Sequence, residues 1–233
     1  MPISEPMSPE SQAHEALLTA RRSMRAYLQQ PVPDVLLQSL LIQARRAPSG
    51  ANLQPGHFLQ VRGGLRQALS QALLADWQAG APEQEDYAYF PRPMPMGLRK
   101  RQAASAQALY GALGVARDDR AGRDAQFARN YRFFDAPVAL VVTIDQRFGA
   151  GGYMDLGMSL YGLQLAAAAA GLGSCAIGAL ASYPQTVRRV LGLASSEHIV
   201  CGLALGWPDP EAAVNRTCTE RAALADYFRV LES

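Results

Sequence analysis

The stretch PVALVVTID, residues 137–145, is a continuous run of apolar residues rich in valine and isoleucine. Such a run is typical of a β-strand that is buried on both faces of a sheet. IVCGLALGW (199–207) has the same character, SCAIGAL (174–180) is a shorter apolar run, and HFLQVR (57–62) alternates apolar and polar residues. These four segments predict one central sheet.

Segments with helical periodicity separate the predicted strands. They are residues 9–20, 33–47, 65–80, 98–130 with a turn at 114–122, 153–170 and 182–193. A few strands between long helical insertions indicate an α+β fold, with one sheet covered on both faces. We expect residues 1–233 to form a single domain. In it, residues 81–97 are rich in proline and aromatic residues without periodicity, and they predict an ordered covering loop.

Composition and charge exclude several classes of partner. A formal net charge of +2 gives no overall basic footprint for nucleic acid or for an anionic membrane. The apolar stretch 153–170 is interrupted by Asp155, Gln164 and two glycines, so we expect a core helix and not a membrane span. Three widely spaced cysteines, without histidines at ligand spacing, predict reduced thiols and no metal site. Because the amino terminus carries acids and prolines in place of an export signal, we expect a cytoplasmic protein.

The motif RRSMR follows the first predicted helix. Arg21, Arg22 and Arg25 supply guanidinium groups and Ser23 supplies a hydroxyl, a combination that suits a terminal phosphate. The alternative is a solvated helix end, where basic residues suit the negative end of the helix dipole.

The motif APSGANLQP (47–55) stands between the second helix and the first strand. Pro48 is expected to end the helix, and Gly50 allows the backbone to approach a ligand closely. Ser49, Asn52 and Gln54 offer hydrogen-bond donors and acceptors. The alternative is an ordinary polar loop.

The motif GLGSCAIGAL (171–180) places Gly178 inside a predicted strand. A glycine at such a position commonly marks a bulge, or a close approach of the backbone to another group. The alternative is tight packing against the preceding helix.

Taken in order, RRSMR, APSGANLQP, FFDAPVALVVTID, MDLGMSLYGLQLAAAAAGLGSCAIG and CGLALGWPDPEAAVNRTCTER resemble the FMN-dependent nitroreductase family over nearly the whole chain. The middle of the chain is similar to the nitrobenzoate or quinone reductase-like subgroup. The resemblance implies a nitroreductase-like fold, in which helices flank a mostly antiparallel sheet. It also implies an intertwined homodimer with two FMN sites at the subunit interface, and a covering insertion at about residues 81–130.

The resemblance also implies a role for each motif. The FMN phosphate would be held by Arg21, Arg22 and Ser23, together with Arg216 or Arg221 near the carboxyl end. Arg25 would reach the pyrimidine end of the flavin ring. The wall contributed by the other subunit would contain Pro48, Ser49, Gly50, Asn52 and Gln54. The backbone that runs along the ring near its reactive nitrogen would be that of Ala176, Ile177, Gly178 and Ala179.

The implied activity is a ping-pong reaction. NADH or NADPH gives hydride to FMN, and the flavin then reduces a small aromatic substrate such as a nitroaromatic, a quinone or another electron-poor ring. This chemistry needs no protein nucleophile, so we expect no catalytic side chain and an inert Cys175. The alternatives are another flavin chemistry on the same fold, such as flavin reduction, dehalogenation or dehydrogenation, or a non-catalytic flavin-binding dimer.

Four further expectations concern single positions. Asp155 is expected to be a satisfied acid at a helix start. Gly56, where the family often has tryptophan, is expected to leave space before the first strand. The basic residues Arg92, Arg99, Lys100 and Arg101 are expected either to form a solvated face or to select an anionic substrate or the NADPH phosphate. Aromatic and thioether side chains are expected to form a wall over the flavin: Tyr87, Tyr89, Phe90, Met94 and Met96, with Tyr131, Phe133 and Phe134 nearby. The alternative for most of these residues is a place in the core or in the dimer contact.

Overall fold

The central sheet has four strands in the order β1-β2-β4-β3, and each neighbouring pair is antiparallel. The strands are β1 His57–Gln60, β2 Val138–Asp145, β3 Gly173–Ile177 and β4 Glu197–Gly206. The computed structural model describes residues 8–232. All four predicted strands and the α+β fold are therefore confirmed.

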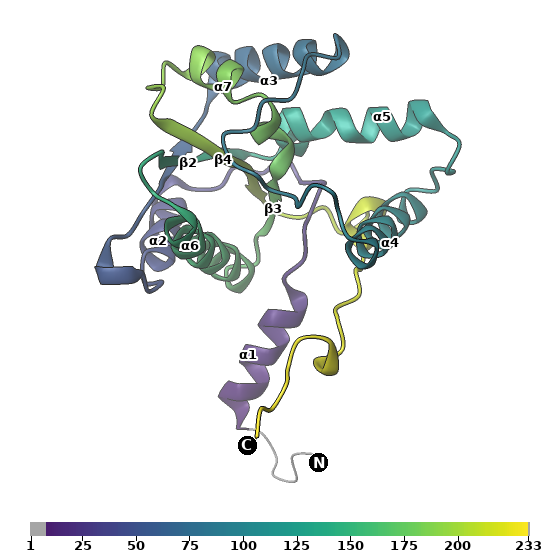
Figure 1. Cartoon of the computed structure of the whole chain (residues 1–233). Helices are drawn as coiled ribbons and strands as arrows, with labels where there is room; N and C mark the ends of the chain where they lie inside the picture. Colours follow the sequence, from purple (N-terminus) through teal and green to yellow (C-terminus); the bar gives the residue numbers. More distant parts are fainter. Residues whose placement is uncertain (1–7, 233) are drawn as a thin grey trace.

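Helices cover both faces of this sheet (Figure 1). Their bounds are α1 Pro9–Ala20, α2 Asp34–Ala44, α3 Gly63–Gln78, α4 Met96–Ala112, α5 Arg120–Ala128, α6 Ala150–Ala169 and α7 Pro184–Leu191. Short 3₁₀ turns are η1 Gly50–Asn52, η2 Arg129–Asp135, η3 Gly178–Ser182, η4 Ala213–Arg216 and η5 Leu224–Asp226. Helices α3 and α7 lie over one face, and α2 and α6 lie over the other.

The two apolar layers explain the composition of β2. Ala139 and Val141 belong to the cluster beneath α3 and α7, whereas Val138 and Leu140 belong to the cluster beneath α2 and α6. Successive side chains of a strand point to opposite faces. A strand covered on both faces is therefore apolar on both, as the run at 138–142 predicts, and it is followed by the buried polar residue Thr143.

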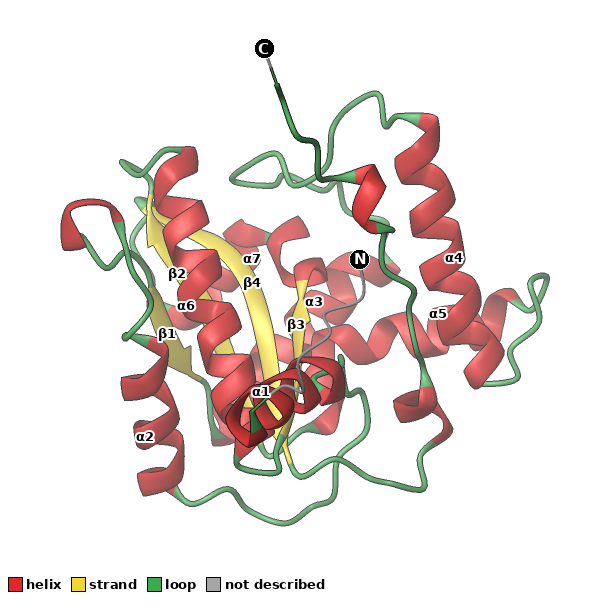
Figure 2. Cartoon of the chain, turned by 90° about the horizontal axis from the view of Figure 1, so that it is seen from below, coloured by secondary structure: helices red, strands yellow, loops and turns green. Residues whose placement is uncertain are grey.

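Two segments extend away from the layered body. Helix α1 and the C-terminal arm, residues 217–232, project from the same end of the molecule (Figure 1), and α4 lies apart from the sheet near this arm (Figure 2). No residue of α1 is fully buried. Within residues 8–232, no helix combines the length and the hydropathy needed to span a membrane.

Three predicted boundaries are wrong. The third strand ends at Ile177 and not at Leu180, because Gly178 opens the 3₁₀ turn η3. Helix α2 ends at Ala44, before Pro48. Helix α6 begins at Ala150, so Asp155 lies in its second turn and not at its start.

The expectation of space at Gly56 is also wrong. Its φ is +82°, and a Cβ atom there would lie 2.6 Å from Cδ1 of Leu156 and 2.9 Å from the backbone oxygen of Thr143. Glycine is required at this position by both the backbone conformation and the tight packing of α6 against the sheet.

Candidate active site

A cavity of about 1000 Å³ lies between the end of α1, helix α4 and the C-terminal arm. Five arginines line it: Arg21, Arg22, Arg25, Arg101 and Arg221. Within residues 8–232, no aspartate or glutamate is among its lining residues. Ser23, Thr217 and Thr219 add hydroxyl groups. Among the described residues, Arg101 pairs with Asp226 at 3.9 Å, and the other four arginines form no ion pair. A cluster of guanidinium groups with nearby hydroxyls is suited to a phosphate-bearing ligand.

The motif RRSMR lies in this cavity because it docks on the free edge of β3. The backbone N–H of Met24 donates to the oxygen of Ser174 at 3.0 Å, and Ser23 forms an isolated parallel bridge with Ser174. A Cβ atom on Gly173 would lie 2.7 Å from Cγ of Met24. Gly173 therefore allows the close approach that brings the arginines to the sheet edge.

The segment Ala176–Ala179 follows on the same edge. The backbone oxygen of Ser174 points away from β4, because it accepts the hydrogen bond from Met24. Residues two apart in a strand direct their N–H and C=O groups to the same side. The backbone polar groups of Ala176 therefore also point to the free edge. Ala176 and Gly178 are exposed. A Cβ atom at Gly178 would meet no heavy atom within 4 Å, so a flat ligand can approach the backbone here.

The expected aromatic wall is formed only in part. Tyr89, Phe90 and Met94 line the cavity, and the rings of Tyr89 and Phe90 meet edge to face at 4.7 Å. The other five residues of that expectation do not line it. Tyr87 donates a hydrogen bond to the oxygen of Val200 at 2.8 Å, Met96 is exposed on α4, and the remaining three are buried in the core: Tyr131, Phe133 and Phe134.

Of the four basic residues of the 92–101 region, one lines the cavity and three do not; among these three, Lys100 is exposed on α4. Arg101 lines the cavity. Arg92 pairs with Glu85, and Arg99 donates to the oxygen of Met94. Of the two carboxyl-end candidates, Arg221 lines the cavity, whereas Arg216 is exposed and is not among the lining residues.

The loop 48–54 lies on the opposite side of the molecule from α4 and the C-terminal arm (Figures 1 and 2). Within one chain it does not meet the arginine-lined cavity. Three of its non-glycine residues have positive φ: Ala51 at 48°, Asn52 at 57° and Gln54 at 49°. Such backbone persists only where the surroundings hold it, and it is often found at functional sites.

Two polar side chains hold this loop, the buried Asp155 and the partly exposed Arg45. Asp155 of α6 accepts a hydrogen bond from the N–H of Gly50 at 3.0 Å, and Arg45 donates to the oxygens of Gln54 and Pro55 at 2.9 Å. Within the loop, the N–H of Gln54 donates to Oγ of Ser49 at 2.9 Å. Asp155 therefore anchors the loop, a role that the sequence does not reveal.

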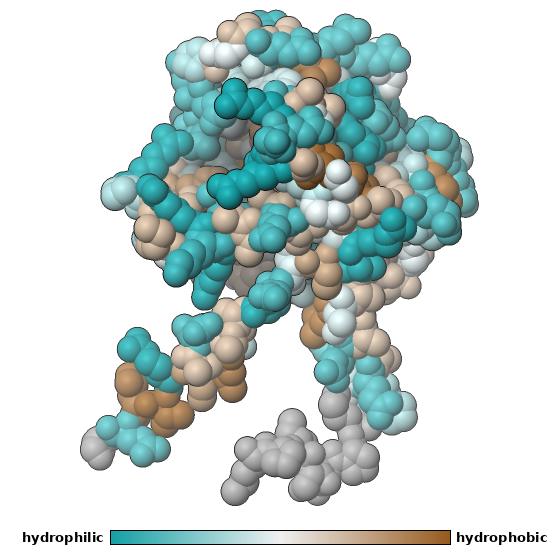
Figure 3. Space-filling model, turned by 90° about the vertical axis from the view of Figure 1, so that its right-hand side faces the viewer, coloured by the Kyte–Doolittle hydropathy of each residue, from teal (hydrophilic) through white to brown (hydrophobic). Residues whose placement is uncertain are grey.

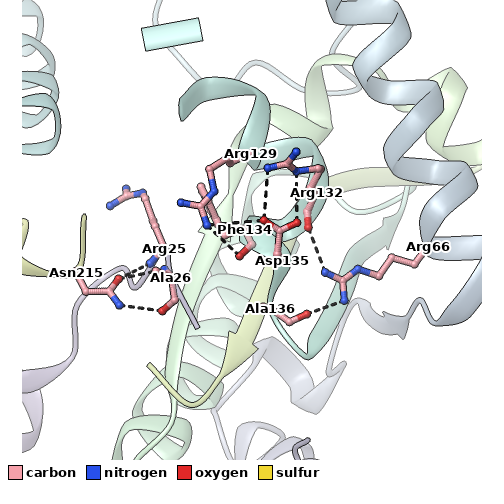
Figure 4. Close-up of polar contacts among 9 residues, drawn as sticks. All are labelled: Arg25, Ala26, Arg66, Arg129, Arg132, Phe134, Asp135, Ala136 and Asn215. Atoms are coloured by element: carbon pink, nitrogen blue, oxygen red, sulfur yellow. Dashed lines mark hydrogen bonds and ion pairs between the residues drawn. The ribbon is translucent and has the colours of Figure 1, made fainter. Parts of the chain in front are cut away.

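The sequence also missed Asn215, whose side chain contacts the main chain next to Arg25, a residue that lines the cavity (Figure 4). Its amide bonds to the main chain of Arg25, Ala26 and Asp209. The only sequence signal is a lone asparagine in the run AAVNRT, which has no pattern of its own.

A strained turn, residues 133–135, precedes strand β2. Phe133, Phe134 and Asp135 all have φ between 52° and 58°. Arg66 of α3 donates to the oxygens of Arg132 and Ala136 on either side of the turn (Figure 4), at 3.1 and 2.6 Å. These bonds hold the turn that leads into β2.

The two buried thiols, Cys175 and Cys201, are unsuited to catalysis. Burial raises the pKa of Cys175, and it raises the pKa of Cys201 to about 12. A protonated thiol is a poor nucleophile. His198 does not face a cysteine; its Nδ1 lies 2.9 Å from the hydroxyl of Tyr153.

The cavity meets the chemical requirements of FMN on two counts. It offers guanidinium and hydroxyl groups for a phosphate, and beside them an exposed strand end and aromatic side chains for a planar ring.

Comparison with known proteins gives a consistent result. Residues 18–207 match the model of the nitroreductase family. The chain is 33% identical over 221 residues to a chloronitrobenzene nitroreductase of Comamonas testosteroni, covering 94% of this chain and 97% of the relative. It is 34% identical over 201 residues to a 4-nitrobenzoate reductase of Pseudomonas putida, covering 86% and 88%. Among solved structures, the FMN and NADPH-dependent nitroreductase NfnB from sphigopyxis sp. strain HMH superposes with a TM-score of 0.90 at 39% identity, covering 94% of this chain and 99% of that one.

Proposed function

The chain belongs to the nitroreductase family, and from this premise we propose that it is an FMN-dependent oxidoreductase that uses NAD(P)H to reduce nitroaromatics, quinones or related electron-poor rings. The relatives named above act on nitroaromatic compounds, and the NfnB structure is that of an FMN- and NADPH-dependent enzyme. The observation in this chain that carries the proposal is the cavity with five arginines and no carboxylate.

We assign the phosphate of FMN to Arg21, Arg22, Ser23 and Arg221, which line the cavity together. Guanidinium groups bind phosphate oxygens through paired hydrogen bonds, and the serine hydroxyl adds another donor. Arg216 is not assigned, because it does not line the cavity.

We assign Arg25 and the segment Ala176–Ala179 to the ring. When bound, FMN supplies the hydride chemistry. The positive charge of Arg25 favours the negative charge that develops at the pyrimidine end of the ring on reduction. The outward N–H groups of the strand end would supply hydrogen-bond donors to the bound ring at the sheet edge. No side chain of this chain has to form a covalent bond with substrate.

The substrate would lie on the face of the ring that Tyr89, Phe90 and Met94 border. Aromatic and thioether side chains favour a flat, apolar substrate. Because these residues and the lining residues of α4 fall between 81 and 130, we propose that this segment is the covering insertion of a single domain. Its role is to exclude water from the ring.

We further propose that the protein works as a homodimer, in which the loop 48–54 completes the flavin site of the second copy. The loop is held in strained backbone but is remote from the cavity of its own chain. Apolar side chains are exposed on α6 and on the C-terminal arm: Met154, Met158, Tyr161, Tyr227, Phe228, Val230 and Leu231. Figure 3 shows the arm carrying apolar atoms away from the body. Surfaces of this kind are typical of subunit interfaces.

A cytoplasmic location is part of the same proposal. The three cysteines are free thiols, which is usual in a reducing compartment.

Anaerobic titration tests the enzymatic proposal. We expect purified protein to be yellow, NADH or NADPH to bleach its flavin spectrum, and nitroaromatic or quinone substrates to restore it. Turnover with each nicotinamide and each substrate class then separates this activity from other flavin chemistry. A colourless protein that binds no added FMN contradicts the proposal.

Subunit mixing tests the dimer. Arg21→Ala/Arg22→Ala and Ser49→Ala/Asn52→Ala variants should each bind FMN weakly. In a mixed dimer, the second variant's arginines meet the first variant's loop, so one of the two sites is intact. Recovery of FMN binding on mixing supports the shared site. No recovery in dimers shown by mass spectrometry to be mixed would place the loop at its own chain's flavin, and the proposal would fail.

A further inference from the structure

Asn215 is buried, with a relative exposure of 7%, and all four hydrogen bonds that an amide side chain can readily make are satisfied. Its Oδ1 accepts from the N–H groups of Arg25 at 2.8 Å and Ala26 at 3.2 Å. Its Nδ2 donates to the oxygen of Ala26 at 2.8 Å (Figure 4) and to that of Asp209 at 2.9 Å. Because two donors face the oxygen and two acceptors face the nitrogen, only one orientation of the amide fits.

This amide joins segments that lie far apart in the sequence. Arg25 and Ala26 precede Asn215 by about 190 residues. Other backbone bonds hold the ends of the same segment: Met24 donates to Ser174 at 3.0 Å, and Leu28 donates to Trp207 at 2.9 Å. Between these fixed points, the N–H of Arg25 has the side chain of Asn215 as its partner.

The guanidinium group of Arg25 has little else to fix it. Among residues 8–232 it forms no ion pair, and its one hydrogen bond runs 3.4 Å to the oxygen of Ser23. Arg25 nonetheless lines the cavity. The position of its charge therefore depends on its main chain, and the main chain depends on Asn215.

We infer that Asn215 is a positioning residue. It holds the main chain of Arg25 so that the guanidinium group of Arg25 lies where its charge stabilises reduced FMN more than oxidised FMN. The inference rests on the proposed function, since it takes the flavin ring to lie beside Arg25. A preorganised cation acts most strongly on the state in which negative charge has developed. Displacement of Arg25 should therefore weaken the binding of reduced FMN more than that of oxidised FMN.

The Asn215→Ala variant separates positioning from simple structural support. Loss of the amide leaves the N–H groups of Arg25 and Ala26 without their acceptor, and we expect reduced FMN to bind about tenfold less tightly relative to oxidised FMN. For a two-electron couple, a tenfold change in this ratio lowers the midpoint potential of the bound flavin by about 30 mV. Redox titration against a reference dye measures this potential, and fluorescence quenching measures the dissociation constant of oxidised FMN.

Thr186→Val is the matched control. Thr186 has a similar exposure of 8%, and its hydroxyl donates to Asp76 at 2.5 Å, remote from the cavity lining. This variant should lose stability while the flavin potential stays unchanged. If Asn215→Ala also lowers only stability, or weakens both redox states of FMN equally, its role is structural and the inference is overturned.

A double-mutant cycle with Arg25→Gln tests the route of the effect. If Asn215 acts through Arg25, then Asn215→Ala should produce no further potential shift in the Arg25→Gln background. Additive shifts overturn the inference. If Asn215→Ala does not fold, Asn215→Ser replaces it, because the serine hydroxyl retains part of the hydrogen bonding. We then expect a smaller shift of the flavin potential in the same direction.

The wild-type protein distinguishes the two levels of failure. A wild type that binds no FMN contradicts the proposed function itself. A wild type that binds FMN with a potential that neither Asn215 variant shifts contradicts only the positioning role.

Discussion

Replacing Asp86 with alanine should destabilise the protein strongly, because Asp86 is the buried anchor of the covering segment. Its carboxylate pairs with both terminal nitrogens of Arg188, at 2.6 and 3.0 Å, and it accepts from the N–H of Ile199 at 2.8 Å. The side chains of Asp86 and Arg188 are only 10% and 14% exposed. Alanine would leave a buried guanidinium without its counter-charge.

The magnitude follows from the burial of this pair. Breaking a buried, hydrogen-bonded ion pair by removing one partner costs about 3–5 kcal/mol. For a chain of this length, each kcal/mol lowers Tm by about 2–4 °C, so we expect a fall of roughly 10 °C. Urea unfolding monitored by far-UV circular dichroism measures the free energy, and limited proteolysis should show faster cleavage within residues 81–97.

The neighbouring residue supplies the control. Glu85 pairs with Arg92, whose side chain is 76% exposed, and an exposed pair contributes less than about 1 kcal/mol. Glu85→Ala should therefore change the free energy of unfolding far less than Asp86→Ala, and Asp86→Ala/Arg188→Ala should cost less than the sum of the two single variants. Equal effects of the Glu85 and Asp86 variants would refute the reasoning.

Three further predictions use other features of the structure. Arg221→Ala should raise the FMN dissociation constant about tenfold by removing a charged donor, while Arg216→Ala leaves it nearly unchanged in a fluorescence titration; the reverse order would contradict the assignment. Gly56→Ala should lower the free energy of unfolding by about 2 kcal/mol or more, since φ is +82° and a Cβ would lie 2.6 Å from a leucine methyl; a urea midpoint at or above that of wild type would count against this packing. Hydrogen bonds from Arg147 lower the pKa of Asp145 to about 2, below the value of about 3.9 of an unfolded chain. The stability difference between wild type and Asp145→Asn should then be fully present above pH 4 and disappear as the pH falls towards 2; a difference that persists at pH 2 would show that the pair is not its source.

Much of the fold could be predicted because its determinants are local. The run 138–142 is apolar at every position because both faces of β2 are covered. Helical periodicity identifies the segments that become α1, α2, α3, α6 and α7. A boundary is not encoded locally where glycine permits either strand or turn geometry. At Gly178 an apolar run continues while the backbone turns into 3₁₀ geometry, so composition alone favours a strand that is not there.

The site was predictable to the extent that its chemistry is concentrated in short motifs. RRSMR marks the arginines and the serine that the cavity brings together, and the family resemblance is confirmed by the family match. The assignment of individual side chains to FMN remains a prediction. The aromatic wall was overpredicted, since Phe133 and Phe134 look the same in sequence whether they face a ligand or fill the core.

The residues that the sequence missed act through partners distant along the chain. Asn215 reaches Arg25 across about 190 residues, Asp155 reaches Gly50 across 105, and Asp86 reaches Arg188 across 102. Asp155 lies in the helical segment 153–170 and Asn215 in the family motif that ends at Arg221, but neither pattern indicates which distant backbone group the side chain contacts.

The sequence by itself determined the strands, the helices and the groups available for binding phosphate and a ring, because periodicity and residue chemistry are properties of short segments. Only the tertiary structure decided which of those groups meet. It placed Arg221 but not Arg216 at the cavity, separated the loop 48–54 from the five arginines that line the cavity, and showed that Gly56 is tightly packed. The physical reason is that these outcomes depend on contacts between elements remote in sequence, where packing and hydrogen bonding fix positions that no local pattern encodes.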